Sequence, residues 1–280
     1  MKNNKYNNLL LSPYLIWSGI FIIIPLLLVV FFSFTVQENG SYVFSLANFE
    51  RLFDPLYAKV FVRSLWIALL STILCFIMGY PAAYIISRAK VSRRSTLILL
   101  IILPMWMNFL LRTYAWAAIL GKNGILNTII TAIGFEPINI LYTDMAVLLG
   151  MVYNFLPFMI LPIYTSLSKM DYDLINAAKD LGANEMQVFT KVVFPLSLPG
   201  VASGITMVFM PAVSTFVISK LLGGGQYMLL GNLIEQQFMT VGDWHFGSAV
   251  SIVMMIMILL SMAFMNKFDK DSNEGGGLLL

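Results

Sequence analysis

The chain has 280 residues, of which 59% are hydrophobic and only 11% are charged, and its mean hydropathy is +0.83. Soluble domains carry about 25% charged residues, so this composition excludes a soluble domain and predicts a polytopic membrane protein. The formal net charge of +3 gives no indication of a nucleic-acid partner, and the single cysteine, Cys75, excludes an internal disulfide framework.

Six apolar runs are each long enough to cross a bilayer, which takes about 20 residues. They are expected at residues 13–34, 60–87, 97–120, 141–167, 196–218 and 246–264. Pro157 and Pro162 are expected to break or kink the fourth span, because each removes one backbone hydrogen bond. Between the first two spans, apolar residues in a polar stretch suggest a short amphipathic segment at the membrane surface: Leu46, Phe49, Leu52 and Phe53.

The distribution of basic residues predicts that both termini are cytoplasmic. Six spans place the termini on one side, and cytoplasmic loops carry the excess of Lys and Arg. With the termini inside, eleven basic residues are cytoplasmic, five are outside and Arg112 lies in the third span. We therefore expect a cytoplasmic N-terminus (1–12), a six-span domain (13–268) with a cytoplasmic loop (169–195), and a cytoplasmic tail (269–280).

The cytoplasmic loop contains a second pattern, two short amphipathic helices around a glycine. Apolar residues at helical spacing predict one stripe on the first helix: Leu174, Ala177, Ala178 and Leu181. Gly182 is expected to end that helix in a left-handed turn. Asn184 is a candidate N-cap for a second helix that carries Met186, Phe189 and Val193 on one face. Such a loop is suited to docking on a partner.

No set of residues in the sequence supports catalysis. The one histidine, His245, cannot form a metal cluster or a histidine-based triad by itself. No phosphate-binding loop with its lysine occurs, since Gly223, Gly224 and Gly225 are followed by Gln226. We therefore expect that the chain is not an enzyme, holds no cofactor or metal, and hydrolyses no ATP.

Arg112 is the clearest charge inside a predicted span, where a charge is costly unless it is paired. It either lines a pathway or interface, or it extends toward the membrane surface. Aromatic residues and acids nearby in the spans and outer loops complete the candidate pathway, although aromatic residues also gather at any membrane interface. The candidate pathway residues are Arg112, Tyr114, Trp116, Asp144, Tyr153 and Glu235.

The cytoplasmic loop resembles the coupling loop of ABC (ATP-binding cassette) importer permeases, which reads Glu-Ala-Ala, three residues, Gly, nine residues and Ile-x-Leu-Pro. Ala177, Ala178, Gly182 and Pro195 match this pattern. Asn176 stands in place of the glutamate, and Val192 and Phe194 stand in place of Ile and Leu. The resemblance implies an all-α membrane protein with the type I ABC importer permease fold, whose coupling helix docks on a separate ATPase that binds ATP and Mg²⁺.

The third span resembles that of polyamine ABC permeases, and of their first permease subunit in particular. The matching residues are Leu103, Pro104, Trp106, Leu111, Arg112, Thr113, Tyr114, Ala115 and Trp116. The outer loop around Leu221–Phe238 and the tail from Glu274 to Leu278 are also similar. The resemblance implies transport of spermidine or putrescine in a bacterial inner membrane. The implied partners are a second homologous permease, two ATPase subunits, an extracytoplasmic binding protein and the lipid bilayer.

Three alternatives remain open at the level of sequence. The first is an ABC permease for another small solute, such as an opine, an amino-acid-like compound or a metal-bearing anion. The second is an ion-coupled secondary transporter, which would be expected to carry acids within its spans; these spans have almost none. The third is a membrane scaffold that transports nothing.

Overall fold

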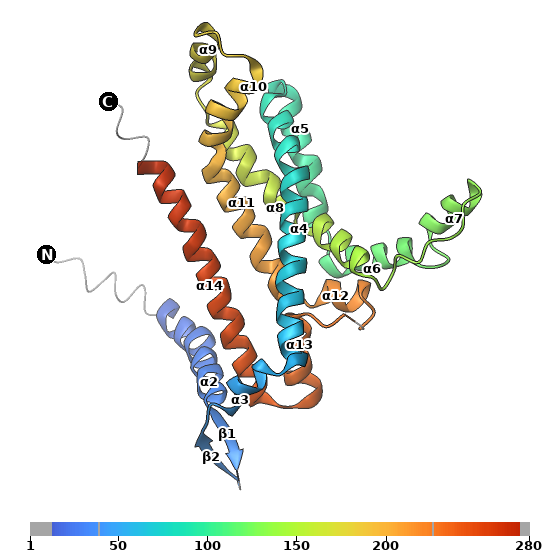
Figure 1. Cartoon of the computed structure of the whole chain (residues 1–280), viewed down its shortest axis with the longest axis vertical. Helices are drawn as coiled ribbons and strands as arrows, with labels where there is room; N and C mark the ends of the chain where they lie inside the picture. The colour runs from blue at the N-terminus through green and yellow to red at the C-terminus, as the bar shows by residue number, and fades with distance from the viewer. Residues whose placement is uncertain (1–12, 39, 226, 275–280) are drawn as a thin grey trace, which may run out of the picture. The chain divides into compact units, whose positions relative to one another are not determined.

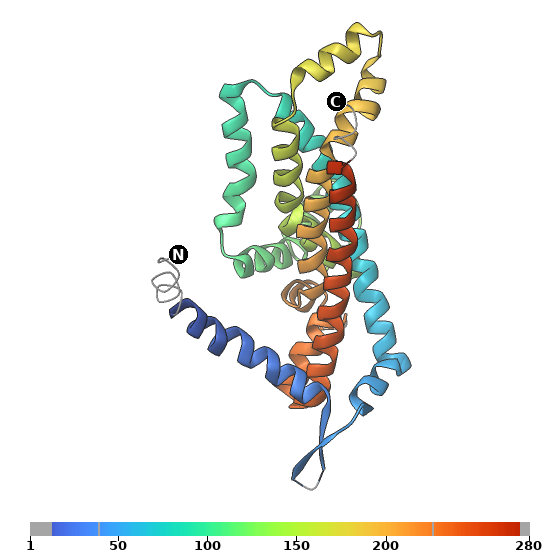
Figure 2. The same cartoon turned by 90° about the vertical axis from the view of Figure 1, so that its left-hand side faces the viewer.

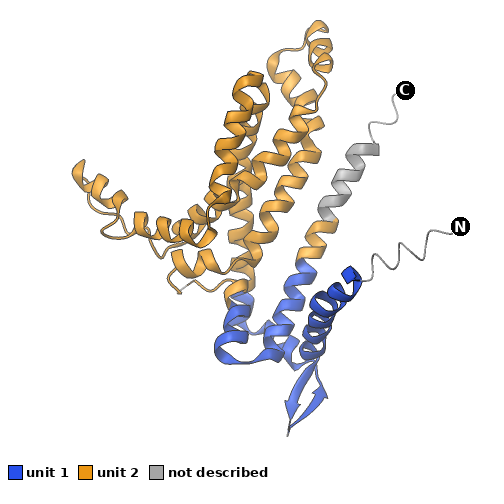
Figure 3. Ribbon diagram, turned by 180° about the vertical axis from the view of Figure 1, so that it is seen from behind, with its two compact units in different colours: residues 1–60, 233–257 blue, residues 61–232, 258–280 orange. Residues whose placement is uncertain are grey.

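The structure, a computed structural model, describes residues 13–38, 40–225 and 227–274 and is predominantly helical (Figures 1 and 2). The chain forms two compact units, which are considered separately (Figure 3). Unit 1 contains residues 1–60 and 233–257, and unit 2 contains residues 61–232 and 258–280. The predicted N-terminal segment 1–12 and residues 275–280 of the predicted tail lie outside the described residues.

Five described helices are long and apolar enough to cross a membrane. They are Pro13–Ser33, Pro55–Arg88, Asp144–Ser168, Glu185–Ser214 and Trp244–Ala263. A sixth span arises if one bent pair of helical segments, Val91–Trp106 and Phe109–Ala132, counts as one span. The predicted all-helical membrane architecture is therefore confirmed, and the third span takes an unexpected form.

The region of the third expected span, residues 97–120, is not one continuous helix. α5 (Val91–Ile102) ends in a 3-10 turn, η3 (Leu103–Trp106), and the chain then bends by 91° before α6 (Phe109–Leu120). Asn108 causes the new start, because its backbone is extended and its side chain accepts hydrogen bonds from the N–H groups of Leu110 and Leu111. This N-cap begins a separate helix inside a continuous apolar run.

Unit 1 combines an N-terminal segment with a second segment, residues 233–257, from late in the sequence. Its elements are η1 (Gly19–Ile23), α2 (Ile24–Ser33), β1 (Thr35–Glu38), β2 (Ser41–Phe44), α3 (Ala47–Glu50), η2 (Arg51–Phe53), the start of α4 (Pro55–Arg88), most of α13 (Leu230–Gln236), η5 (Gln237–Val241) and the first half of α14 (Trp244–Glu274). β1 and β2 form an antiparallel hairpin that the sequence did not predict. The short helical segment expected around Leu46 is present as α3 and η2.

An ion pair and an aromatic ring tie the two chain segments of unit 1 together. Arg51 Nη1 lies 2.8 Å from Asp243 Oδ2, and the Arg51 guanidinium lies 4.1 Å from the centre of the Phe246 ring. Burial alone would raise the pKa of Asp243. Hydrogen bonds from the Phe246 N–H and from Arg51 outweigh that effect and hold the pKa of Asp243 below its ordinary value.

Unit 2 centres on two helices that pack side by side, α8 (Asp144–Ser168) and α11 (Phe194–Ser214) (Figure 1). A methyl group on Gly200 of α11 would lie 2.7 Å from the carbonyl oxygen of Pro162 and 2.6 Å from Cβ of Ser166 on α8. Glycine therefore permits this close approach of the two helices. The remaining elements are α5, η3, α6, α7 (Ile125–Ala132), α9 (Tyr172–Asp180), α10 (Glu185–Val188), η4 (Phe189–Val193), α12 (Val217–Leu222) and most of α4.

The expectation that prolines break the fourth span is wrong. α8 remains one continuous helix through Pro157 and Pro162. Each proline removes only one intrahelical hydrogen bond, and packing against neighbouring helices offsets such local losses. The fifth span also differs from expectation, since α11 ends at Ser214 and a separate short helix, α12, follows.

Candidate functional site: the coupling segment and the outer polar clusters

The coupling segment, defined here as residues 169–195, begins with α9. Asp171 caps this helix, since its side chain accepts a hydrogen bond from the Asp173 N–H at 3.0 Å. The helix ends as predicted at Gly182, whose φ is +86°. Two hydrogen bonds close the turn, from Gly182 N–H to the Lys179 carbonyl and from Ala183 N–H to the Ala178 carbonyl. This is a Schellman turn, which requires a left-handed residue at this position.

The second helix of the segment starts at the predicted cap. The Asn184 side chain accepts from the Gln187 N–H, and the Gln187 side chain accepts from the Asn184 N–H, each at 2.9 Å, to form a capping box. The expectation that this helix is short is wrong. α10, the π-turn η4 and α11 are continuous from Glu185 to Ser214. The wider π-turn precedes Pro195, which has no N–H to donate to the preceding turn.

An ion pair bridges the two helices across the Gly182 turn. Lys179 Nζ lies 2.6 Å from Glu185 Oε1. Both side chains are solvent-exposed, so the pair orients the turn more than it stabilises the fold.

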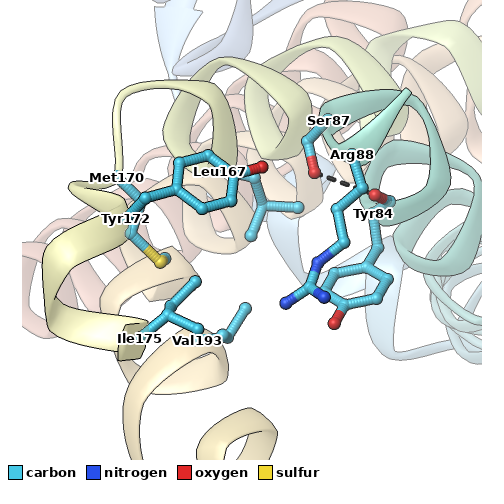
Figure 4. A pocket seen from close by; sticks show the side chains of 8 residues that line it. All are labelled: Tyr84, Ser87, Arg88, Leu167, Met170, Tyr172, Ile175 and Val193. Atoms are coloured by element: carbon cyan, nitrogen blue, oxygen red, sulfur yellow. Dashed lines mark hydrogen bonds between the residues drawn. The ribbon is translucent and has the colours of Figure 1, made fainter. Parts of the chain in front are cut away.

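The first helix of the coupling segment, α9, contacts the rest of unit 2 through Ile175. This side chain is only 7% exposed and lies in a crevice between the end of α4 and the end of α8 (Figure 4). Figure 4 labels the lining side chains, Tyr84, Ser87, Arg88, Leu167, Met170, Tyr172, Ile175 and Val193. The coupling segment is therefore seated directly on the ends of two membrane-spanning helices.

The predicted apolar stripe faces away from this crevice. Leu174 is 49% exposed and Leu181 is 89% exposed. Of the motif residues, four are exposed and Ala178 is half-buried; the exposed ones are Asn176, Ala177, Gly182 and Pro195. The segment thus buries Ile175, Val188 and Val193 in its own chain and presents Leu174 and Leu181 outward.

Arg112 lies inside unit 2 near two of the predicted aromatic residues. Its side chain is only 8% exposed, and its guanidinium lies 6.0 Å from the centre of the Tyr153 ring. The Trp116 ring packs edge-on against Tyr153 at 5.3 Å. Among the described residues, Nε and Nη1 of Arg112 have no hydrogen-bond partner. This burial argues against extension of the Arg112 side chain toward the membrane surface.

The other predicted pathway residues do not join this cluster. Tyr114 is exposed on α6. Asp144 begins α8 and pairs with Arg63 of α4, with Nη2 and Oδ1 2.6 Å apart. Glu235 is half-buried on α13, in unit 1, so it belongs to a different unit from the other candidates.

The sequence matches one protein family over most of its length. The matching family is described as "Binding-protein-dependent transport system inner membrane component", and the match covers residues 1–272. The chain belongs to this family. The predicted family and fold class are therefore confirmed, and the chain is a multi-pass inner-membrane permease component of a transport system.

Two relatives and two solved structures resemble this permease along nearly all of its length. A spermidine/putrescine transport system permease, PotB, from Haemophilus influenzae is 41% identical, covering 92% of each chain. PotB from Salmonella typhimurium is 39% identical, covering 94% of this chain and 93% of the relative. The fold matches two crystal structures of bacterial alginate ABC transporters, one of them bound to its periplasmic protein, with TM-scores of 0.82, 17% identity and 96% of both chains covered.

Three residues of this permease have structural roles that the sequence did not reveal. Ile175 is the buried residue of α9, whereas the sequence pattern indicated the stripe around it. Arg63 and Tyr227 form a cluster with Asp144, since the Arg63 guanidinium lies 4.2 Å from the centre of the Tyr227 ring. These residues are 81 or more positions apart in sequence, so no local pattern indicates the contact.

Proposed function

We propose that this chain is one of two permease subunits of an ABC importer that moves spermidine and putrescine across the inner membrane. The observation that carries the substrate class is the likeness to permeases named for spermidine and putrescine transport, at 39% to 41% identity over more than nine-tenths of this chain. The alternative is an ABC permease for another small solute, and the uptake experiment below distinguishes the two.

The coupling segment supports the ATP-driven part of the proposal. Leu174 and Leu181 form a small exposed apolar surface. It lies next to the Gly182 turn, whose geometry is fixed by hydrogen bonds. Association with a partner that removes apolar side chains from water is favourable. In this proposal the surface docks on an ATPase subunit, and that subunit, not this chain, binds ATP and Mg²⁺.

The remaining partners follow from the family. A binding-protein-dependent system delivers its solute from an extracytoplasmic binding protein, and here that protein would carry the polyamine. A second homologous permease would complete the pathway, and two ATPase subunits would drive alternating access. Both termini and the coupling segment would lie in the cytoplasm, as the distribution of basic residues indicates. The first span has no buried residue in its most apolar window. It would therefore contact lipid or the second permease.

The test is uptake of radiolabelled spermidine by bacterial cells that lack this chain and express its partner subunits. Wild-type chain should restore uptake that stops when ATP is depleted. Leu181→Asp should abolish it, because a carboxylate replaces an apolar contact in the docked state. The matched control is Val91→Asp, since Val91 is 80% exposed and lies at the start of α5, outside the coupling segment.

Three outcomes separate the parts of the proposal. No spermidine or putrescine uptake with wild-type chain would exclude the polyamine assignment and require other solutes to be tried. Uptake without ATP would contradict the ABC mechanism. Unchanged uptake with Leu181→Asp, at equal membrane levels, would show that this surface is not the ATPase contact. A Leu181→Cys variant provides a direct check by cross-linking to the ATPase, because the native Cys75 is buried.

A further inference from the structure

Three side chains of unit 2 form an ionic and aromatic cluster outside the coupling segment. Arg63 of α4 pairs with Asp144 at the start of α8, with 2.6 Å between Nη2 and Oδ1. The same guanidinium stacks on the ring of Tyr227, 4.2 Å from its centre. The side chains of Arg63 and Asp144 are 31% and 51% exposed, so a solute can reach the cluster.

Hydrogen bonds anchor the chain on both sides of Tyr227. Before the loop, the Tyr142 N–H donates to the Leu222 carbonyl at 2.8 Å. After it, the Leu230 N–H donates to the hydroxyl of Ser64, the residue next to Arg63, also at 2.8 Å. Leu222 and Leu230 are both fully buried. The ring of Tyr227 is therefore held beside α4 by an anchor on each side of the loop.

The chemistry of this cluster is that of an ammonium site. A primary ammonium group is bound by a carboxylate, through a charge-assisted hydrogen bond, and by an aromatic face, through cation–π attraction. Asp144 supplies the carboxylate and Tyr227 supplies the face. In this structure the cation between them is Arg63, a residue of the chain itself.

The cluster and the coupling segment lie at opposite ends of the same two helices. Asp144 begins α8, and the coupling segment follows the end of α8 at Ser168. With a rise of 1.5 Å per residue, the 25 residues of α8 separate these ends by about 37 Å, more than the thickness of the hydrocarbon core. Arg63 lies near the start of α4, and Tyr84 at its other end lines the crevice that holds Ile175. The cluster therefore faces the side from which an importer receives its solute.

We infer that Asp144 and Tyr227 form a receiving site for one ammonium group of the transported polyamine, and that Arg63 occupies this site until the substrate displaces it. This inference rests on the proposed polyamine function. Displacement replaces one cation by another at the same carboxylate, so it leaves no unpaired charge on Asp144. Displacement also breaks the ion pair that joins α4 to α8. Substrate arrival would thereby be linked to movement of the two helices that contact the coupling segment.

The test measures the KM for spermidine uptake, which should change in opposite directions when Asp144 and Arg63 are each replaced. In cells with the complete transporter, Asp144→Asn should raise the KM for spermidine uptake about three- to tenfold, because the substrate loses its carboxylate. Arg63→Gln should lower KM by a similar factor, because the substrate loses its competitor. Tyr227→Leu should raise KM, since Leu fills space but has no aromatic face. If Arg63 and Asp144 only stabilise the fold, both variants shift uptake in the same direction.

A similar ion pair in unit 1 provides the control. It tests whether the loss of any Arg–Asp pair stacked on an aromatic ring changes KM. Arg51 pairs with Asp243 and stacks on Phe246, with nearly the same geometry. Arg51→Gln should leave KM for spermidine unchanged at equal membrane levels.

The outcomes also separate this inference from the proposed function. If wild-type chain transports no polyamine, the proposed function fails. If it does, but Asp144→Asn leaves KM unchanged or Arg63→Gln raises it, only the receiving site fails. A lower KM with Arg51→Gln as well as Arg63→Gln would show that loosening of the chain, not release of a competitor, explains the result.

Discussion

Gly182 allows a controlled test of the coupling segment, because a second turn with nearly the same geometry, at Gly134, lies outside that segment. At Gly182, φ is +86°, and no heavy atom lies within 4 Å of the position that a Cβ would take. Gly182→Ala therefore adds backbone strain without a steric clash. A non-glycine residue in the left-handed region costs about 1–2 kcal/mol, which is a factor of about 5–30 in the population of the native turn.

Gly134 ends α7 with the same geometry. Its φ is +93°, it too has open space at Cβ, and the N–H groups of Gly134 and Phe135 donate to the carbonyls of Thr131 and Ile130 in the same pattern. Gly134→Ala should thus introduce equal strain outside the coupling segment.

We expect Gly182→Ala to reduce ATP-dependent uptake per membrane-inserted chain by about fivefold or more, and Gly134→Ala to leave it near wild type. Uptake and ATPase activity of the complete transporter should be measured together, with membrane levels from immunoblots. Gly182→Asn should lose less activity than Gly182→Ala, because asparagine tolerates the left-handed region better. Equal uptake in the two alanine variants would refute the argument that the turn at Gly182 sets the geometry of coupling.

Three further predictions concern stability. Gly200→Ala should destabilise the chain by about 1–3 kcal/mol in detergent melts, because the new methyl group meets the rigid Pro162 carbonyl; an unchanged melt would refute the close packing of α8 and α11. Arg112→Met should leave the melting temperature unchanged or raise it, since two buried nitrogens carry an uncompensated desolvation cost of about 1–3 kcal/mol, and a fall of several degrees would contradict this. The pKa of Asp243, paired with Arg51, is lowered in the folded state, so its stabilising contribution is present above the ordinary Asp pKa of about 4 and is lost as the pH falls through the lowered value. Asp243→Asn should flatten that acid dependence of the melting temperature, and an identical pH profile would refute it.

The features predicted correctly from sequence are those set by local chemistry. Apolar run length alone located the membrane-spanning segments, because a bilayer imposes a minimum length on any helix that crosses it. Gly182 and Asn184 marked the end of one helix and the start of the next, because each has a conformational or capping property that few other residues share. These predictions depend on a residue and its nearest neighbours.

The features that were missed depend on competition between local and distant effects. Asn108 is an N-cap within an apolar run, and hydropathy averages over such a residue, so the 91° bend escaped prediction. Pro157 and Pro162 are unfavourable in an isolated helix, yet α8 stays continuous in its packed environment. The ion pair between Arg63 and Asp144 joins residues 81 positions apart, a separation that no periodicity encodes.

The continuity of α10 with α11 changes how movement can pass through this permease. α8 is one continuous helix that contains both of its prolines, Pro157 and Pro162. The coupling segment is held on one side by α8 and on the other by α11, and these two helices are in direct contact at Gly200 and Pro162. Closely packed interfaces shift between discrete arrangements and do not deform continuously. A pull on the segment by an ATPase would therefore be expected to move α8 and α11 together. The far end of α8, which carries Asp144, would move with them.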